Sequence, residues 1–222
     1  MKNTFDSIAV LALALSAQAA FSQTAGTWMA RVGAATIAPQ VSSGNLTAPS
    51  FPNTMGDVGA ASQIAGGISY MYSDHVSVDL PLALPFTHKL YGAGALANAG
   101  QIGEVQALPL TVFFQYRFME PSAAFRPYVG VGPTYAYFFN EKGSGALTAM
   151  TNPGGTPTTL KIDSQFTYSA QIGATYALNE KWFVDVFYSK TPLKTKNTYS
   201  TGQTLDITLD PVSYGVSVGM KF

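Results

Sequence analysis

The chain has 222 residues, no cysteine and a net charge of zero, with twelve basic and twelve acidic side chains. Charged residues make up 11% of it, against about 25% in an ordinary soluble domain, so it lacks the charge with which a soluble domain covers its surface. The balanced charge gives no indication of a nucleic-acid partner, and the length fits a single domain.

The first predicted element is a secretory signal peptide over residues 1–22. Lys2 provides the positive start, and an apolar run and then small residues follow it. Cleavage is compatible with two positions, after Ala19 or after Ser22, and we favour Ser22. A helical anchor is the alternative, but the apolar run is too short to span about 30 Å of hydrocarbon. Residues 23–222 are predicted to form one mature domain.

The mature sequence is a series of segments in which apolar residues alternate with small polar ones, as in a β-strand with one apolar face. Eight such segments cover residues 28–35, 63–72, 76–84, 108–118, 128–139, 166–178, 182–189 and 212–222. Just before the last segment, the apolar set changes parity at Asp210-Pro211, which predicts a bulge.

The connections alternate between short and long. Short turns are expected at 73–75, 119–125 and 179–181, and long loops at 39–62, 87–103, 140–164 and 195–204. Short turns on one rim and long loops on the other are typical of an outer-membrane barrel.

The polar face of the segments favours a barrel over a soluble β-sandwich. It consists mainly of Gly, Ser, Thr, Ala and Gln, which suits a narrow lumen better than a surface in water. Aromatic residues at the segment ends predict two girdles. The girdle expected at the inner rim comprises Trp28, Tyr72, Phe118, Trp182 and Phe222. The girdle expected at the outer rim comprises Phe86, Tyr137, Phe139 and Phe166. We therefore predict an all-β fold, an eight-stranded antiparallel transmembrane β-barrel.

Several motifs, in order along most of the mature chain, resemble the outer membrane protein W family. They are Pro85–Lys89, Leu108–Thr111, Gln115–Phe118, Arg126–Gly132, Tyr135, Phe138-Phe139, Trp182 with Asp185, and the terminal Phe222. Val212 departs from the family, which often has an aromatic residue there.

The resemblance implies a bacterial outer-membrane barrel that admits small hydrophobic molecules and passes them laterally into the bilayer, and the alkane-uptake barrels belong to the same group. The expected partners are outer-membrane lipid, small hydrophobic ligands and the barrel-assembly machinery, the last through the C-terminal strand ending in Phe222. The alternative is a structural or receptor barrel with a sealed lumen, whose loops bind phage, toxin or host. A continuous apolar cavity from the loops to the wall favours transport.

Three sets of inward-facing or wall residues are candidates for function. The charged set is expected to form cross-lumen ion pairs, with a structural or a gating role: Arg31, Asp79, Arg117, Asp185 and Lys221. The apolar set is expected to line a ligand path or to fill the lumen: Met29, Met71, Phe113 and Phe138. The third set consists of prolines, which interrupt strand hydrogen bonding: Pro81, Pro85, Pro109 and Pro133. They either hold open a lateral gate in the wall or mark ordinary bulges and strand ends.

Catalysis has little support in the sequence. His75 is expected in a short turn and His88 at a strand end, and no Gly-x-Ser-x-Gly elbow accompanies them. The sequence does not indicate a metal site, because it has no cysteine, no paired histidines and no acidic cluster at ligand spacing. We expect no enzyme activity and no cofactor.

Overall fold

The structure is a computed structural model that describes residues 22–222, so the signal-peptide prediction, apart from Ser22, lies outside the described residues. The helical elements are η2 (Ala97–Ala99) and α2 (Gly145–Thr151). The strands are β1 (Trp28–Ala38), β2 (Ser42–Ser43), β3 (Thr54–Val58), β4 (Ala61–Met71), β5 (Val76–Ala83), β6 (Phe86–Gly94), β7 (Gln101–Thr111), β8 (Phe113–Arg117), β9 (Phe125–Gly143), β10 (Leu160–Ile162), β11 (Gln165–Ala177), β12 (Trp182–Lys190), β13 (Lys194–Tyr199), β14 (Thr204–Thr208) and β15 (Val212–Lys221).

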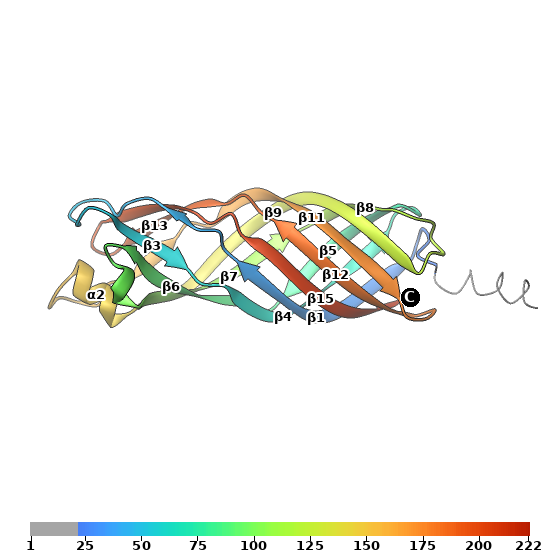
Figure 1. Ribbon diagram of the computed structural model, residues 1–222, viewed down its shortest axis with the longest axis horizontal. Helices are drawn as coiled ribbons and strands as arrows, with labels where there is room; N and C mark the ends of the chain where they lie inside the picture. The colour runs from blue at the N-terminus through green and yellow to red at the C-terminus, as the bar shows by residue number, and fades with distance from the viewer. Residues whose placement is uncertain (1–21) are drawn as a thin grey trace, which may run out of the picture.

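Four strands pair in a small sheet of their own, β10-β13-β14-β2, and the other eleven form one closed antiparallel barrel sheet. The sheet runs β11-β12-β15-β1-β4-β5-β8-β9-β7-β6-β3, and a pairing between β11 and β9 closes it. Three barrel strands are each interrupted once, into β3 and β4, β5 and β6, and β7 and β8, so the sheet contains eight barrel strands. The predicted eight-stranded barrel is confirmed. Figure 1 shows it as a long tube with tilted strands, with α2 at one end and the C-terminus at the other.

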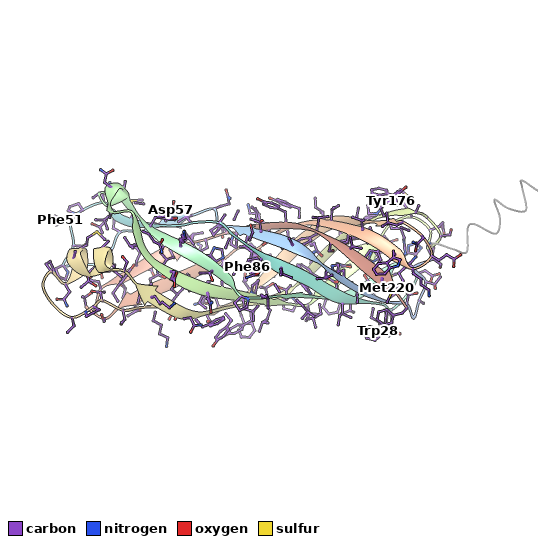
Figure 2. The ribbon with its side chains drawn as sticks, turned by 90° about the horizontal axis from the view of Figure 1, so that it is seen from below. Trp28, Phe51, Asp57, Phe86, Tyr176 and Met220 are labelled. Carbon is purple, nitrogen blue, oxygen red and sulfur yellow. The ribbon has the colours of Figure 1, made fainter. Side chains whose placement is uncertain are left out.

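Across the part of the barrel next to the short turns, the apolar face of each strand points outward. Val32, Val131 and Val216 are 64%, 62% and 54% exposed, while the opposite parity places small polar residues in the lumen. Trp28, Tyr176 and Met220 lie at the short-turn end, and Phe51 lies at the long-loop end (Figure 2). Such an apolar exterior is stable when it faces hydrocarbon. In residues 22–222, the structure contains no helix that is long and apolar enough to span a membrane.

Toward the long-loop end the two faces exchange roles. Leu205, Ile207 and Leu209 are buried inside, whereas Lys194 and Lys196 point outward. The exchange falls at the predicted break, where Asp210 has a positive φ of 33° and the strand divides into β14 and β15. The tube therefore has a polar interior at one end and an apolar interior at the other.

The long loops are more ordered than expected. Residues 87–103 form most of a β6-η2-β7 hairpin, and residues 195–204 belong to the β13–β14 hairpin. The loop prediction was wrong there because strands that rise above the membrane carry polar residues on their outer face and so resemble loops in composition. Helix α2 is capped by Ser144, whose side chain accepts a hydrogen bond from the Leu147 amide.

Phe86 is a second correction, because it was expected in the outer aromatic girdle. Leu84 is 53% exposed, but Phe86 is only 2% exposed and points into the lumen (Figure 2). Strict alternation would place both side chains on the same face. Pro85 interrupts the strand between β5 and β6, and the parity changes across this interruption.

Candidate functional site: an apolar pocket above a polar floor

The lumen near the short turns is filled by a buried ion pair. Arg31 binds Asp79 through two hydrogen bonds, Nη1 to Oδ1 at 2.6 Å and Nη2 to Oδ2 at 2.9 Å. Asp185 adds a second carboxylate, with its Oδ1 3.6 Å from the Arg31 Nε. A Cβ at Gly67 would lie 2.9 Å from the Arg31 guanidinium. This glycine on β4 therefore gives Arg31 room to reach across to β5.

Tyr128 connects this pair to the opposite wall. Its hydroxyl donates to the Asp185 carboxylate, 3.1 Å from Oδ2, and its ring lies over Gly173, where any Cβ would collide with it. The Arg117 guanidinium carbon lies 4.8 Å from the centre of the Tyr128 ring, in cation–π geometry.

Arg117 has hydrogen-bonding partners of a different kind from those expected. It donates to the side chains of Ser77 at 3.0 Å, Gln115 at 2.9 Å and Gln23 at 3.4 Å. Within residues 22–222, none of the ion pairs of 4 Å or less involves Arg117. Of the five predicted charged residues, the structure therefore brings Arg31, Asp79 and Asp185 into direct contact. Arg117 adjoins them through Tyr128.

The N-terminal end of the described chain closes the floor. Gln23 is 1% exposed. Its side-chain amide donates a hydrogen bond to the Thr175 hydroxyl, and its backbone carbonyl accepts one from the Arg126 guanidinium. The sequence analysis missed Gln23 because it precedes the first alternating segment, and it missed Arg126 because that residue opens a strand beside a turn. We refer to Arg31, Asp79, Asp185, Tyr128, Arg117, Gln23 and Arg126 as the polar floor.

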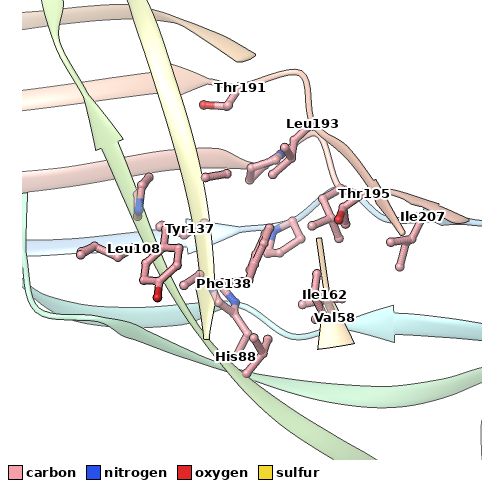
Figure 3. A pocket seen from close by; sticks show the side chains of 18 of the residues that line it. Val58, His88, Leu108, Tyr137, Phe138, Ile162, Thr191, Leu193, Thr195 and Ile207 are labelled. Carbon is pink, nitrogen blue, oxygen red and sulfur yellow. The ribbon is translucent and has the colours of Figure 1, made fainter. Parts of the chain in front are cut away.

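Above the polar floor, the lumen contains two small adjoining cavities. The upper cavity has a volume of about 70 Å³, and its apolar lining includes Leu90, Val105, Phe138, Leu193, Ile207 and Leu209 (Figure 3). The lower cavity has a volume of about 90 Å³ and more hydroxyl groups in its wall. Both are lined by Ile37, Pro109, Thr191 and Ser213, so they lie next to each other.

The barrel wall beside these cavities has an unpaired stretch. The β5–β8 ladder ends at Asp79↔Phe113, and the β6–β7 ladder begins at Phe86↔Ala107. Residues 80–85 and residues 108–112 lie between the two ladders, and the two segments are not paired with each other in either ladder. The cavities reach this stretch, because Leu82 lines the lower cavity and Leu108 the upper one.

Three of the four predicted prolines border this unpaired stretch. Pro81 and Pro85 lie on one side of it and Pro109 on the other, and none of them has an N–H with which to bridge it. Pro133 lies one strand away, in the continuous β9–β11 ladder opposite Tyr168, and its carbonyl accepts a hydrogen bond from the Val112 amide at 3.2 Å. The sequence could not separate Pro133 from the others, because its position depends on strand pairing.

A third cavity of about 530 Å³ lies among the long loops and is lined in part by Pro49, Phe51, Leu96 and Met150. One buried apolar cluster separates it from the lumen cavities. Its members are Leu90, Ile102, Val105, Leu147, Leu160, Ile162, Tyr199 and Leu205. Of these, Leu90, Val105 and Ile162 line the upper lumen cavity, and Ile102, Leu147, Tyr199 and Leu205 line the loop cavity. We call this cluster the septum.

The OmpW family model matches residues 24–222. The chain belongs to the OmpW family. It is 34% identical to outer membrane protein W of Vibrio cholerae, over all of both chains, and 26% identical to outer membrane protein AlkL of Ectopseudomonas oleovorans, over 71% of this chain and 64% of that protein. The crystal structure of OprG from Pseudomonas aeruginosa superposes with a TM-score of 0.81 and 27% identity, over 90% of this chain and 98% of that one.

Membership in the OmpW family, a family of non-enzymatic barrels, places this protein in the bacterial outer membrane. The exposed belt around Val32, Val131 and Val216 therefore faces lipid. The short turns lie on the periplasmic side and the long loops outside.

The predicted apolar path residues of this OmpW-family barrel divide between two places. Phe138 lines the upper cavity and Phe113 the lower one. Met29 and Met71 instead pack against Phe183 in a separate buried cluster. Lys221 pairs in register with Met29 at the same end. Sequence parity identified all of these residues as inward-facing, but it could not give their depth.

Proposed function

We propose that this barrel takes up small apolar molecules at its outer end and releases them sideways into the bilayer. The observation that carries the proposal is the unpaired stretch of wall between residues 80–85 and 108–112, which adjoins two apolar lumen cavities. A ligand in these cavities is next to the wall and one side chain away from lipid.

The rest of the lumen supports a sideways route. The polar floor closes the periplasmic side, because the side chains of Arg31, Asp79 and Arg117 are buried and bonded to one another or to neighbouring side chains. Passage of an apolar molecule through the floor would break these hydrogen bonds without replacing them. Each buried polar group left without a partner costs about 1–3 kcal/mol of free energy, and a charged group costs more. The loop cavity on the outer side provides an apolar place of capture.

The test is to close the unpaired stretch. If the β5–β8 register continued, Leu82 would face Leu110, and both side chains point outward, with 48% and 52% exposure. The chain contains no cysteine, so Leu82→Cys and Leu110→Cys give a single defined pair for a short, cleavable bis-maleimide. We expect cross-linking to abolish uptake of naphthalene into vesicles with a lipopolysaccharide outer leaflet, and cleavage of the linker to restore it.

The matched control joins the same two strands where they are already paired. Val78 and Phe114 are register partners, so a cross-linked Val78→Cys/Phe114→Cys pair leaves uptake at its starting rate. Equal uptake by both cross-linked proteins would reject lateral release. Equal uptake by vesicles with and without the protein would reject transport itself.

The septum favours the alternative, a structural or receptor barrel, because it fills the lumen between the loop cavity and the inner cavities. In the transport proposal the septum must open, whereas a receptor barrel keeps it closed. Truncating two of its members, Leu147→Ala and Leu205→Ala, is expected to increase naphthalene uptake. A sealed barrel would show no change.

A further inference from the structure

The upper lumen cavity contains one polar group without a partner. Asn197 is 6% exposed and lines this mainly apolar cavity. Its side-chain oxygen Oδ1 has no hydrogen-bond partner, and among the buried side-chain atoms of residues 22–222 it alone is in this state. A buried acceptor without a partner costs about 1–3 kcal/mol, so a group that supplied the missing donor would be held there.

The position of Asn197 follows from the strand pattern. On β13 the side chains of Thr195, Asn197 and Tyr199 point inward, while Lys194 and Lys196 point out. Asn197 lies between Ile162 on β10 and Leu205 on β14. The next inward-facing residue on the same strand is Tyr199.

The other fully buried polar side chains of the cavity each have at least one hydrogen-bond partner. His88 Nδ1 lies 2.8 Å from the Gly59 carbonyl, and the Thr195 hydroxyl donates to the Asp163 carbonyl. Thr134 and Thr191 both bond to Ser169. Ser213 is only partly buried. Asn197 therefore differs from every other fully buried polar residue of this wall.

We infer that the upper cavity selects apolar molecules that carry one hydrogen-bond donor, such as a phenol or an alcohol, and holds the donor on Asn197 Oδ1. This inference rests on the proposed uptake function and specifies its ligand class. Charged molecules are excluded, because the surrounding wall is apolar and offers no counter-ion. A cavity of about 150 Å³ holds benzene, and the two adjoining cavities of about 70 and 90 Å³ together match that size.

Three fluorinated ligands of similar size test the inference by ¹⁹F NMR on the protein in nanodiscs, with empty nanodiscs as the partition reference. They are 4-fluorophenol, which has a donor, 4-fluoroanisole, which has only an acceptor, and fluorobenzene, which has neither. We expect 4-fluorophenol to bind about tenfold more tightly than 4-fluoroanisole, as one hydrogen bond to a buried group provides. Asn197→Leu removes this preference, whereas Ile207→Val, on the same cavity wall, retains it.

Equal binding of 4-fluorophenol and 4-fluoroanisole by the native protein would overturn the inference without reference to any variant. Retention of the preference by Asn197→Leu would also overturn it. In either case, binding of fluorobenzene leaves the uptake function standing. If none of the three ligands binds above the empty-nanodisc level, the proposed function fails together with the inference.

Discussion

Single residues decide how the polar floor is held together, and Asp79 is central to it. Its carboxylate is fully buried and binds both Nη atoms of Arg31, and the Ser69 hydroxyl also donates to it. Asp185 is farther away, at 3.6 Å from Arg31 Nε. Loss of Asp79 therefore leaves a buried guanidinium with only one, weaker, carboxylate partner.

We expect Asp79→Ala to lower the free energy of unfolding by about 3–5 kcal/mol, because removal of one partner from a buried ion pair leaves the other charge uncompensated. Urea unfolding of the barrel in lipid vesicles measures this loss. The triple variant Asp79→Ala/Arg31→Met/Asp185→Asn removes all three contacting charges and should regain most of the stability. A triple variant no more stable than Asp79→Ala would show that the uncompensated charge is not the cause.

At this scale, sequence parity identified which side chains point inward but not which of them meet. Arg31 and Asp79 lie on strands separated by β4, and their contact depends on the registers Arg31↔Gly67 and Ser69↔Asp79. Asn197 was missed altogether, because it lies in a segment that was expected to be a loop. Its unpartnered oxygen is a property of the packed structure and leaves no signal in the sequence.

Among the elements, the terminal strand β15 closes the barrel by pairing with β1 and β12. The residue that follows it, Phe222, exchanges two backbone hydrogen bonds with Trp28, each of 2.9 Å, and the Phe222 side chain is 66% exposed. The backbone of Phe222 therefore secures the seam, and its exposed ring is the group through which we predict recognition by the barrel-assembly machinery.

Deletion of Phe222 is expected to reduce assembled barrel in the outer membrane several-fold, because both the seam bonds and the exposed ring are lost. Phe222→Ala keeps the backbone bonds and removes only the ring. The amount of heat-modifiable barrel in outer-membrane fractions measures both effects. Normal assembly of Phe222→Ala together with failure of the deletion would assign the role to the backbone and reject recognition through the ring.

The strands also show where the alternation of apolar and polar residues is sufficient to predict which way side chains point, and where it is not. Within the lipid-facing belt, a period of two predicted strands and their orientation, because lipid and lumen impose opposite chemistry on the two faces. Beyond the belt, Leu205, Ile207 and Leu209 turn inward and lysines face out, as in a water-soluble sheet. A break such as Leu84-Pro85 changes parity within one strand, which is why Phe86 was assigned to the wrong face.

For the whole molecule, the arrangement amounts to a tube that is polar and closed at the periplasmic end and apolar at the outer end. Arg117 connects two neighbouring strands of the closed end to the N-terminal segment, since it donates to Ser77 on β5, to Gln115 on β8 and to Gln23 at the N-terminal end of the described chain. Its role is structural, or it also seals the lumen against ions.

Arg117→Ala separates these roles. Loss of the three hydrogen bonds should lower the free energy of unfolding by about 2–4 kcal/mol. If Arg117 also seals the floor, water and ions enter the space it leaves, and single-channel conductance in planar bilayers rises above that of the native protein. The lipid-facing variant Val186→Ala serves as a control that should not conduct. Reduced stability with unchanged conductance would leave Arg117 a structural residue, and the seal would then depend on Met29, Met71 and Phe183, which are packed together at the same end.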